Sequence, residues 1–341
     1  MWLSVNEYKP PEREPVEVSA SASRKPSRLG PIQMYIWNIG YAALDAKQDF
    51  FMDGGKGVRP ASASEVEENL SAIQAFISDA AADIFFLQEV DLNSKRSYYI
   101  NQAERISQAW KGSSAFALNF KAPFVPIPFP EFIGKAESGL LNLNTFSSTA
   151  ERISLPTSFK WPERVAQLKR CLLVERIPIH DNDSAATGAG SNAAAQELVL
   201  VNLHLEAFDA DGEGKIAQTK FLAEFLESEY RKGNYCVAAG DFNQVFPALK
   251  DAFPIQENPY FTPGVFDDTL FGEGWIFAAD PSVPSCRSND KPYSGNRENH
   301  QFYIIDGFIL SPNVELVSVQ THDLDFKNSD HNPVKLVFTL K

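Results

Sequence analysis

The sequence has little cysteine and a deficit of positive charge. Its 341 residues include three cysteines, which lie far apart and form no CxxC pair. A zinc ribbon, a redox motif and a disulfide framework therefore have no support. Lys and Arg total 31 against 44 Asp and Glu, which gives a net charge of −13. Because non-specific duplex binding relies on many basic side chains that neutralise phosphates, this balance argues against such a protein.

Long apolar runs are absent as well. No segment approaches the roughly 20 apolar residues that a membrane-spanning helix requires, and nothing near the N-terminus resembles the apolar part of a signal peptide. As the sequence is written, we expect a soluble, cytoplasmic protein with no transmembrane segment. If a leader or anchor precedes Met1, the expectation changes to an extracytoplasmic location.

The chain divides into a short arm and one long folded region. Residues 1–31 are rich in Pro, Ser, Glu and Arg and show little periodicity, which predicts an extended arm. Residues 32–341 are expected to form a single domain. Hydrophobic residues make up 44% of the chain and charged residues 22%, which are ordinary values for a globular protein.

Short apolar runs separated by long loops predict strands through most of this region. They cover residues 34–38, 84–88, 139–146, 171–179, 197–203, 235–239, 303–310, 314–320 and 334–339. Helices are predicted from a capping box at Ser64–Glu67 and over 214–230, and the Ala- and Ser-rich residues 181–196 predict a loop. Because strands outnumber helices, we favour two packed sheets with outer helices over a doubly wound parallel sheet.

Polar residues stand at the ends of several of these apolar segments. A carboxylate, amide or imidazole follows the strand candidates or occupies the turn before the last one: Asn38, Glu89, His204, Asp241, Asn243, Asp306, Asp330 and His331. Polar groups at strand ends converge on one rim of a sheet, where loops form a cleft. We therefore expect these side chains to share one site.

The residue types in this set suit phosphoryl chemistry. Mg²⁺ prefers oxygen ligands, and Glu89, Asn38 and Asp330 offer them. Attack on a phosphodiester needs an activated water and groups that hold a charged transition state. His331 can act as a general base or as a charged phosphate clamp, and His204 can donate to a phosphate oxygen.

The order of the motifs resembles the endonuclease/exonuclease/phosphatase superfamily. The similar segments are Trp37-Asn38, Gln88-Glu89, Asn202-Leu203-His204-Leu205, Gly240-Asp241-Phe242-Asn243, Ile305-Asp306 and Ser329-Asp330-His331-Asn332-Pro333. The resemblance extends over essentially the whole chain after the arm. It implies an α/β (α+β) fold, a four-layer α/β/β/α sandwich of two mostly antiparallel sheets with outer helices. It also implies that residues 32–341 are a catalytic domain, a metal-dependent phosphoric ester hydrolase.

The resemblance assigns roles to the residues that would meet the metal and the phosphate. Glu89 is implied as the main Mg²⁺ ligand, with Asn38 and Asp330 in support and Mn²⁺ as the alternative ion. His331 is implied beside the scissile phosphate, and His204 as a second phosphate contact.

The remaining motif residues are implied to orient these groups. Asp241 and Asn243 would align the attacking water or a second metal, and Asp306 would orient a catalytic histidine. Within the superfamily, the segments 138–141 and 202–209 resemble neutral-sphingomyelinase-like and uncharacterised bacterial members.

Substrate choice is expected to lie in the surrounding loops. Asp53, Arg96, Tyr98 and Arg287 are candidate substrate-binding residues, although turns, solvated loops and surface ion pairs explain the same residues. The Pro-rich apolar stretch 123–130 cannot form a helix, and it either packs against the sandwich or forms an exposed apolar loop near the cleft.

The leading hypothesis is a Mg²⁺-dependent hydrolase of a phosphodiester or phosphomonoester. A small molecule or lipid head group is favoured over nucleic acid because the chain is acidic. One alternative is a metal-dependent endonuclease or exonuclease on DNA or RNA. Another is a non-catalytic binding module on the same fold, which predicts losses from the site, and every residue of the set is present.

Overall fold

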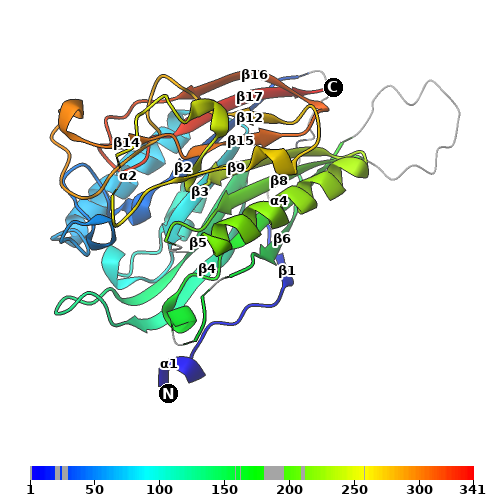
Figure 1. The fold of residues 1–341 in the computed structure, drawn as a ribbon. Coiled ribbons are helices and arrows are strands. Elements are labelled where there is room, and N and C mark those ends of the chain that lie inside the picture. The colour runs from blue at the N-terminus through cyan, green and yellow to red at the C-terminus, as the bar shows by residue number, and fades with distance from the viewer. Residues whose placement is uncertain are drawn as a thin grey trace, which may run out of the picture.

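Two large β-sheets packed face to face make up most of the protein (Figure 1). The computed structural model describes residues 2–19, 24, 30–157, 159–161, 163–179, 196–208, 212–256 and 258–341. The loop predicted over 181–196 lies outside these residues except for Gln196, as do parts of the predicted arm.

The first sheet has seven strands, in the order β1-β6-β7-β8-β9-β15-β12. Their bounds are Arg13–Val16 (β1), Thr149–Ser154 (β6), Cys171–Pro178 (β7), Glu197–His204 (β8), Tyr235–Asp241 (β9), Asp306–Leu310 (β15) and Ile276–Ala278 (β12). Strand β1 pairs with β6, so this part of the predicted arm is an edge strand of the sheet.

The second sheet has six strands, in the order β16-β17-β2-β3-β5-β4. Their bounds are Val314–Thr321 (β16), Val334–Leu340 (β17), Ile32–Asn38 (β2), Ile84–Asp91 (β3), Gly134–Asn144 (β5) and Ser113–Val125 (β4). Two short ladders lie outside the large sheets: Gln244–Val245 (β10) with Gly264–Val265 (β11), and Cys286–Arg287 (β13) with Phe302–Tyr303 (β14).

Helices cover the outer faces of both sheets. Helix α2 (Ala63–Asp79) and α3 (Gln102–Ala109) pack on the second sheet, and α4 (Glu213–Arg231) packs on the first. A short α1 (Trp2–Val5) lies near the N-terminus, and 3₁₀ turns occupy Gly40–Ala42, Phe51–Asp53, Lys95–Ser97, Glu163–Ala166, Pro247–Leu249, Asp268–Leu270 and Arg297–Asn299. The predicted four-layer sandwich is confirmed. Among the described residues, no helix combines the length and apolar character needed to cross a membrane.

The N-terminus of α2 differs from the predicted capping box. Ser62, rather than Ser64, is the N-cap, and its side chain accepts a hydrogen bond from the Glu65 backbone N–H. Both serines are followed three residues later by glutamate, so the sequence pattern alone does not separate them.

Each large sheet contains one parallel strand pair. Strands β2 and β3 are parallel and joined through α2, and β8 and β9 are parallel and joined through α4. All other pairings in the two large sheets are antiparallel. Parallel neighbours end at the same edge of a sheet. The C-terminal ends of β2 and β3 therefore lie side by side, as do those of β8 and β9.

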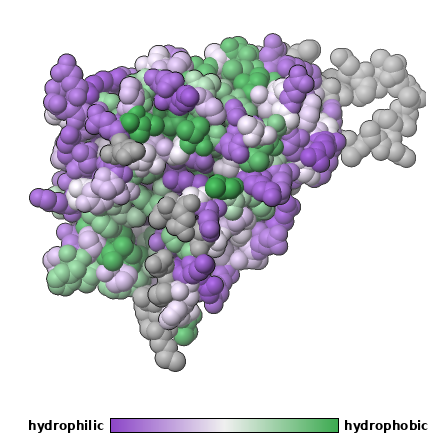
Figure 2. Space-filling view, in the orientation of Figure 1, coloured by the Kyte–Doolittle hydropathy of each residue, from purple (hydrophilic) through white to green (hydrophobic). Residues whose placement is uncertain are grey.

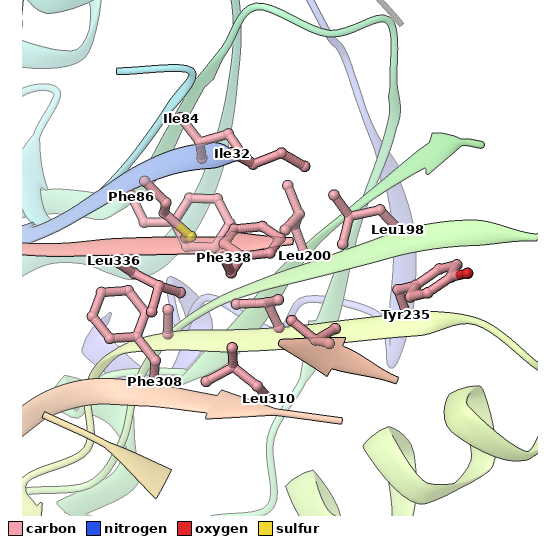
Figure 3. Close-up of a cluster of buried hydrophobic side chains, with 14 of the residues drawn as sticks. Ile32, Ile84, Phe86, Leu198, Leu200, Tyr235, Phe308, Leu310, Leu336 and Phe338 are labelled. Carbon is pink, nitrogen blue, oxygen red and sulfur yellow. The ribbon is translucent and has the colours of Figure 1, made fainter. Parts of the chain in front are cut away.

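The main core lies between the sheets. Figure 3 shows side chains from both sheets meeting there: Ile32, Ile84, Phe86, Leu336 and Phe338 from one, and Leu198, Leu200, Tyr235, Phe308 and Leu310 from the other. Full burial of each such aliphatic or aromatic side chain stabilises the fold by about 1.5–3 kcal/mol.

The strand prediction missed β4, β6 and β12 of the large sheets, the edge strand β1 and the short strands β10, β11 and β13, and it joined two elements. Along most of β4 buried residues alternate with half-buried ones, and Pro123 lies near its C-terminal end. No continuous apolar run therefore marks this strand in the sequence. Pro123 is tolerated because β4 is the edge strand of its sheet. The strand predicted over 303–310 is divided between β14 and β15, because the chain changes ladders at Ile304–Ile305.

Candidate active site

The ends of the two parallel strand pairs bring four of the predicted residues together. Asn38 ends β2, Glu89 lies near the end of β3, and His204 and Asp241 end β8 and β9. His204 and Asp241 are register partners across β8 and β9. The Asn38 amide donates to the Asp241 carboxylate at 3.1 Å, so the two sheets meet at this edge through a hydrogen bond.

Asp306 joins this group through the neighbouring antiparallel strand. It is the first residue of β15, and its register partner is Asp241. The Asp306 carboxylate lies 2.8 Å from Nδ1 of His331, and both side chains are buried. This bond orients the imidazole so that Nε2 faces Asp241, at 3.9 Å.

Charge around His331 favours its protonated form. Burial alone would lower the pKa of His331, but the charge of Asp306 and the hydrogen bond between them raise it well above its ordinary value. The backbone is also held, because the Trp37 indole donates to the His331 carbonyl at 2.9 Å. These contacts hold both the ring and the backbone of His331 in place beside Asp306.

Asp241 is the centre of the polar contacts. Its Oδ1 accepts a hydrogen bond from the Asn243 backbone N–H at 2.9 Å, and its Oδ2 lies 3.5 Å from Nε2 of His204. Burial and the nearby Asp306 raise the pKa of Asp241 to about 6, while His331 acts in the opposite direction. At neutral pH this carboxylate is an ionised acceptor with a pKa close to the ambient pH, which suits a general base.

His204 differs from His331 in its charge. Burial, together with the nearby Arg170 and His331, lowers the pKa of His204 well below its ordinary value. Its Nδ1 atom is buried without a hydrogen-bond partner among the described residues. Nε2 faces carboxylates of Asp241 and Glu89, so a neutral ring with the proton on Nε2 can donate from that atom.

Glu89 is aimed by an irregular piece of backbone. Its φ is +56°, in the left-handed region, and the pairing of β3 with β5 shifts register between Leu87 and Val90. A non-glycine residue there costs about 1–3 kcal/mol, and such bulges re-aim side chains next to active sites. Burial and the charge of Asp330 raise the pKa of Glu89 to about 8, against the influence of Arg96 and His331.

Asp330 is held from two sides. Its Oδ1 accepts from the Ser329 hydroxyl at 3.3 Å, and its Oδ2 accepts from the Asn289 amide. At Gly40, whose φ is +51°, an added Cβ would lie 2.8 Å from the Asp330 carboxylate. Gly40 therefore meets two demands, a left-handed backbone and close approach to Asp330.

The donors fit a divalent cation. Glu89 and Asp330 are carboxylates close enough for the charge of one to raise the pKa of the other, which is the repulsion that a cation would relieve. The side-chain oxygen Oδ1 of Asn38 accepts a hydrogen bond from the Gly40 N–H and has a second lone pair. Ligand atoms of Asp241, Asp306 and His331 also lie within 4.8 Å of one another. In that second group Nδ1 of His331 is already hydrogen-bonded to Asp306, so the Glu89 and Asp330 oxygens fit a hard ion better.

One pocket is lined by Glu89, His204, Asp241, Asp330 and His331. Three of the four predicted substrate-binding residues line it too: Asp53, Arg96 and Arg287. Burial and the nearby Asp330 raise the pKa of Asp53 to about 7. Tyr98 is not among the residues that line the pocket, and its hydroxyl donates to the Pro60 carbonyl at 2.8 Å.

The two arginines at the pocket are held by different partners. Arg96 donates to Asp91 at 3.0 and 3.2 Å. Arg287 donates to the backbone carbonyls of Asp45, at 2.7 Å, and Ser288, at 3.0 Å. Among the ion pairs of the described residues Arg287 has no carboxylate partner, although it lines the pocket.

The pocket also contains residues outside the predicted set of site residues. Arg170 and Glu206 form a buried pair at 3.8 Å, and the Arg170 guanidinium donates to the His204 carbonyl. Glu206 stands two residues after His204, which is the available sequence signal. An apolar wall is made by Leu44, Phe50, Met52, Phe120, Val125, Ile127, Ile133, Leu168, Phe208 and Phe261.

Comparison with known proteins identifies the fold. No protein-family model matches this sequence, and no curated protein matches it. Among solved structures, an endonuclease/exonuclease/phosphatase from Beutenbergia cavernae is similar with a TM-score of 0.60 and 17% identity, covering 91% of this chain and 72% of that one.

Two further structures agree over nearly their whole length. The human Nocturnin catalytic domain has a TM-score of 0.53 at 15% identity and covers 96% of this chain and 98% of its own. ANGEL2, a 2',3'-cyclic phosphatase, has a TM-score of 0.54 at 14% identity, with coverage of 91% and 96%. The fold of this chain is therefore that of the endonuclease/exonuclease/phosphatase proteins, as the motif order indicated.

Proposed function

We propose that this protein is a Mg²⁺-dependent phosphoesterase that hydrolyses a phosphodiester or phosphomonoester of a small molecule or lipid. The observation that carries the proposal is that His331, hydrogen-bonded to Asp306, faces Asp241 in a pocket that Glu89 also lines. The solved neighbours support it, since one is a 2',3'-cyclic phosphatase crystallised with adenosine-2',3'-vanadate.

The two histidines take different parts in the proposed reaction. His331, whose pKa lies well above its ordinary value, holds a non-bridging phosphate oxygen as an imidazolium. His204 stays neutral and donates a second hydrogen bond from Nε2. Of the two roles that the sequence left open for His331, the charged clamp is the one that its pKa favours.

Water is activated on the Asp241 side. Asp241 accepts the proton of the water that attacks phosphorus, the P–O bond to the leaving group breaks, and the departing oxygen takes a proton from solvent water. The Asn243 backbone N–H and the Asn38 amide fix the orientation of the Asp241 carboxylate. A divalent cation held by Glu89, Asp330 and the side-chain oxygen of Asn38 would polarise the phosphoryl oxygens as a Lewis acid.

The pocket wall bears on the choice of substrate. Its apolar side chains suit a phosphoester with an apolar group, and the net charge of −13 disfavours extended contact with a nucleic acid backbone. A nucleotide or a nucleic acid is the second candidate substrate, because the ANGEL2 structure contains an adenosine compound.

Hydrolysis assays with three substrates separate these candidates. Bis-p-nitrophenyl phosphate, sphingomyelin and plasmid DNA are incubated with and without Mg²⁺, using wild type, Glu89→Ala and, as a matched control, Glu315→Ala on the exposed face of β16. We expect Mg²⁺-dependent turnover of the first two, reduced about a thousandfold or more in Glu89→Ala and unchanged in Glu315→Ala.

The other outcomes assign a different function. Plasmid cleavage without lipid turnover, abolished in Glu89→Ala, would make the protein a nuclease. Absence of metal-dependent hydrolysis across a broad phosphoester panel, together with absence of Mg²⁺ or Mn²⁺ binding, would support the non-catalytic binding module instead.

A further inference from the structure

The hairpin between β4 and β5 carries a cluster of exposed aromatic rings. Phe132 packs against Phe124 with ring centroids 5.4 Å apart and against Phe129 with centroids 6.1 Å apart. Phe129 is 85% exposed, Ile127 50% and Phe124 37%. In Figure 1 the hairpin extends from the body at the lower left, and Figure 2 shows apolar surface in that region. We call residues 124–132 the hairpin tip.

The cluster differs from ordinary exposed apolar residues. Elsewhere large exposed side chains such as Ile216, Val317 and Val5 lie on separate elements. At the hairpin tip the exposed residues are adjacent, and five prolines or phenylalanines in 126–130 and 132 leave little polar surface. Soluble proteins rarely expose contiguous apolar patches unless the patch binds a partner or a membrane.

Basic side chains surround the base of this tip. Four cations lie along or against the hairpin, at Arg59, Lys95, Lys121 and Lys135. Arg59 pairs with Glu131, Lys95 donates to the Phe132 carbonyl, and the contacts of Lys121 and Lys135 to Glu137 are long, at 3.6 and 3.5 Å. Lys121 and Lys135 are matched by Glu131 and Glu137 within the hairpin itself. The two additional positive charges among these six groups come from Arg59 and Lys95 on neighbouring segments, in a chain whose net charge is −13. An apolar tip with positively charged side chains next to it complements a lipid surface, whose phosphates lie above its acyl chains.

The same hairpin forms part of the pocket wall. Val125, Ile127 and Ile133 line the pocket that contains Glu89 and His331. Ile127 is also half-exposed, so apolar surface continues from the tip into the pocket. A lipid held at the tip would have an apolar route toward the catalytic residues.

We propose that the hairpin tip inserts into the interfacial region of a phospholipid bilayer and places the mouth of the pocket against the lipid surface. The substrate class then is a phosphoester lipid, and this last step rests on the proposed function. The docking of the hairpin tip does not rest on the proposed function, because vesicle binding is measured without turnover.

Vesicle sedimentation with phosphatidylcholine tests the docking. Phe129→Ser removes the most exposed ring of the tip without touching a residue that lines the pocket. We expect vesicle binding to fall about tenfold or more, because the ring loses its burial in the membrane interface. Ile216→Ser is the matched control, since Ile216 is 68% exposed on α4, and its binding should equal that of wild type.

A second pair of variants tests the basic base of the tip. Lys121→Gln with Lys135→Gln should weaken binding to vesicles that also contain phosphatidylserine, by about fivefold or more, and leave binding to pure phosphatidylcholine nearly unchanged. Phe129→Trp should retain vesicle binding, and its fluorescence should be quenched by brominated lipid.

The controls separate this proposal from the proposed function. Mg²⁺-dependent hydrolysis of bis-p-nitrophenyl phosphate should be equal in wild type and Phe129→Ser. A wild type that hydrolyses this soluble substrate but does not sediment with vesicles overturns the docking alone. A wild type that binds vesicles through Phe129 without hydrolysing any phosphoester overturns the proposed function alone. Concentration-dependent self-association that Phe129→Ser abolishes, without vesicle binding, would assign the tip to a second copy of the chain.

Discussion

The space between the two sheets is filled in two different ways. Around β17, β2, β9 and β15 it is apolar, with side chains such as Phe86 and Phe308 fully buried (Figure 3). Toward β5 and β7 it contains a buried polar chain, here called the polar seam, made by Gln88, Asn202, Asn142, Glu175 and Asn144.

The seam is connected by short hydrogen bonds. The Gln88 amide donates to Asn202 at 2.8 Å, and Asn202 donates to Asn142 at 2.8 Å. Asn142 and Asn144 donate to the Glu175 carboxylate at 3.2 and 2.7 Å. Apolar packing is non-directional and supplies stability, whereas hydrogen bonds between buried groups fix relative positions. Because Gln88 precedes Glu89, the seam is suited to fixing the strand end that carries the candidate metal ligand.

Truncation in the apolar region should have the largest effect on stability. Phe308→Ala removes a fully buried ring from the core and should lower the free energy of unfolding by about 3–5 kcal/mol. Urea denaturation measures the change, and Val317→Ala on the exposed side of β16 should stay within about 0.5 kcal/mol of wild type. Equal losses in the two variants would contradict the assignment of stability to this core.

The seam should make stability depend on pH through Glu175. Burial raises the pKa of Glu175 from 4.5 to about 7, against three hydrogen bonds from its neighbours. The folded state therefore binds this proton more tightly than the unfolded state does. Its contribution to stability is present below about pH 4.5 and is lost as the pH rises to about 7, a change of up to roughly 3 kcal/mol.

Glu175→Gln isolates that contribution. The variant is expected to lose stability overall, because an amide N–H group would face the Asn142 donor, but its stability should fall less between about pH 4.5 and 7 than that of wild type. Urea titrations at several pH values measure the slope. A slope as steep as that of wild type would assign the pH dependence to other groups.

Asn202→Ala should have a smaller effect on stability and a specific effect on activity. It leaves Gln88 and Asn142 without their partner, which costs about 1–3 kcal/mol. If the seam positions Glu89, kcat should fall about tenfold or more while KM changes little. Asn234→Ala is the control, because Asn234 is also buried but lies just before β9, at the opposite end of the strand from Asp241. Equal kcat in the two variants would break the proposed link between the seam and the site.

The sequence predicted the strand ends well because their signal is local. A short apolar run followed by a polar residue marks both the strand and its exit. The observed β2 ends at Asn38 as predicted, and β9, predicted over 235–239, continues two residues further to Asp241. The position of Arg170 has no such signal, because Arg170 reaches the pocket through the pairing of β7 with β8, which are distant in the chain. The apolar stretch 123–130 was recognised in the sequence, but residue types alone did not separate packing from exposure.

Tyr98 shows the opposite difficulty. Four residues after Ser94, which donates to the buried Asp91, the backbone enters the left-handed region at Tyr98 and Tyr99, and the Tyr98 hydroxyl donates to the Pro60 carbonyl. Proximity in sequence to Glu89 therefore did not place it at the pocket, whereas Arg96 does line it. Side-chain direction in a loop depends on backbone angles that residue types alone do not fix.

We propose that Glu89 and Asp330 hold a divalent cation beside the His331–Asp306 pair. Calorimetric titration with Mg²⁺ tests it most directly, using wild type, Glu89→Gln and His331→Asn. We expect saturable binding in wild type, at least about tenfold weaker binding in Glu89→Gln, and retained binding in His331→Asn. Binding of equal strength in Glu89→Gln, or absence of Mg²⁺ and Mn²⁺ binding in the folded wild type, would contradict the account.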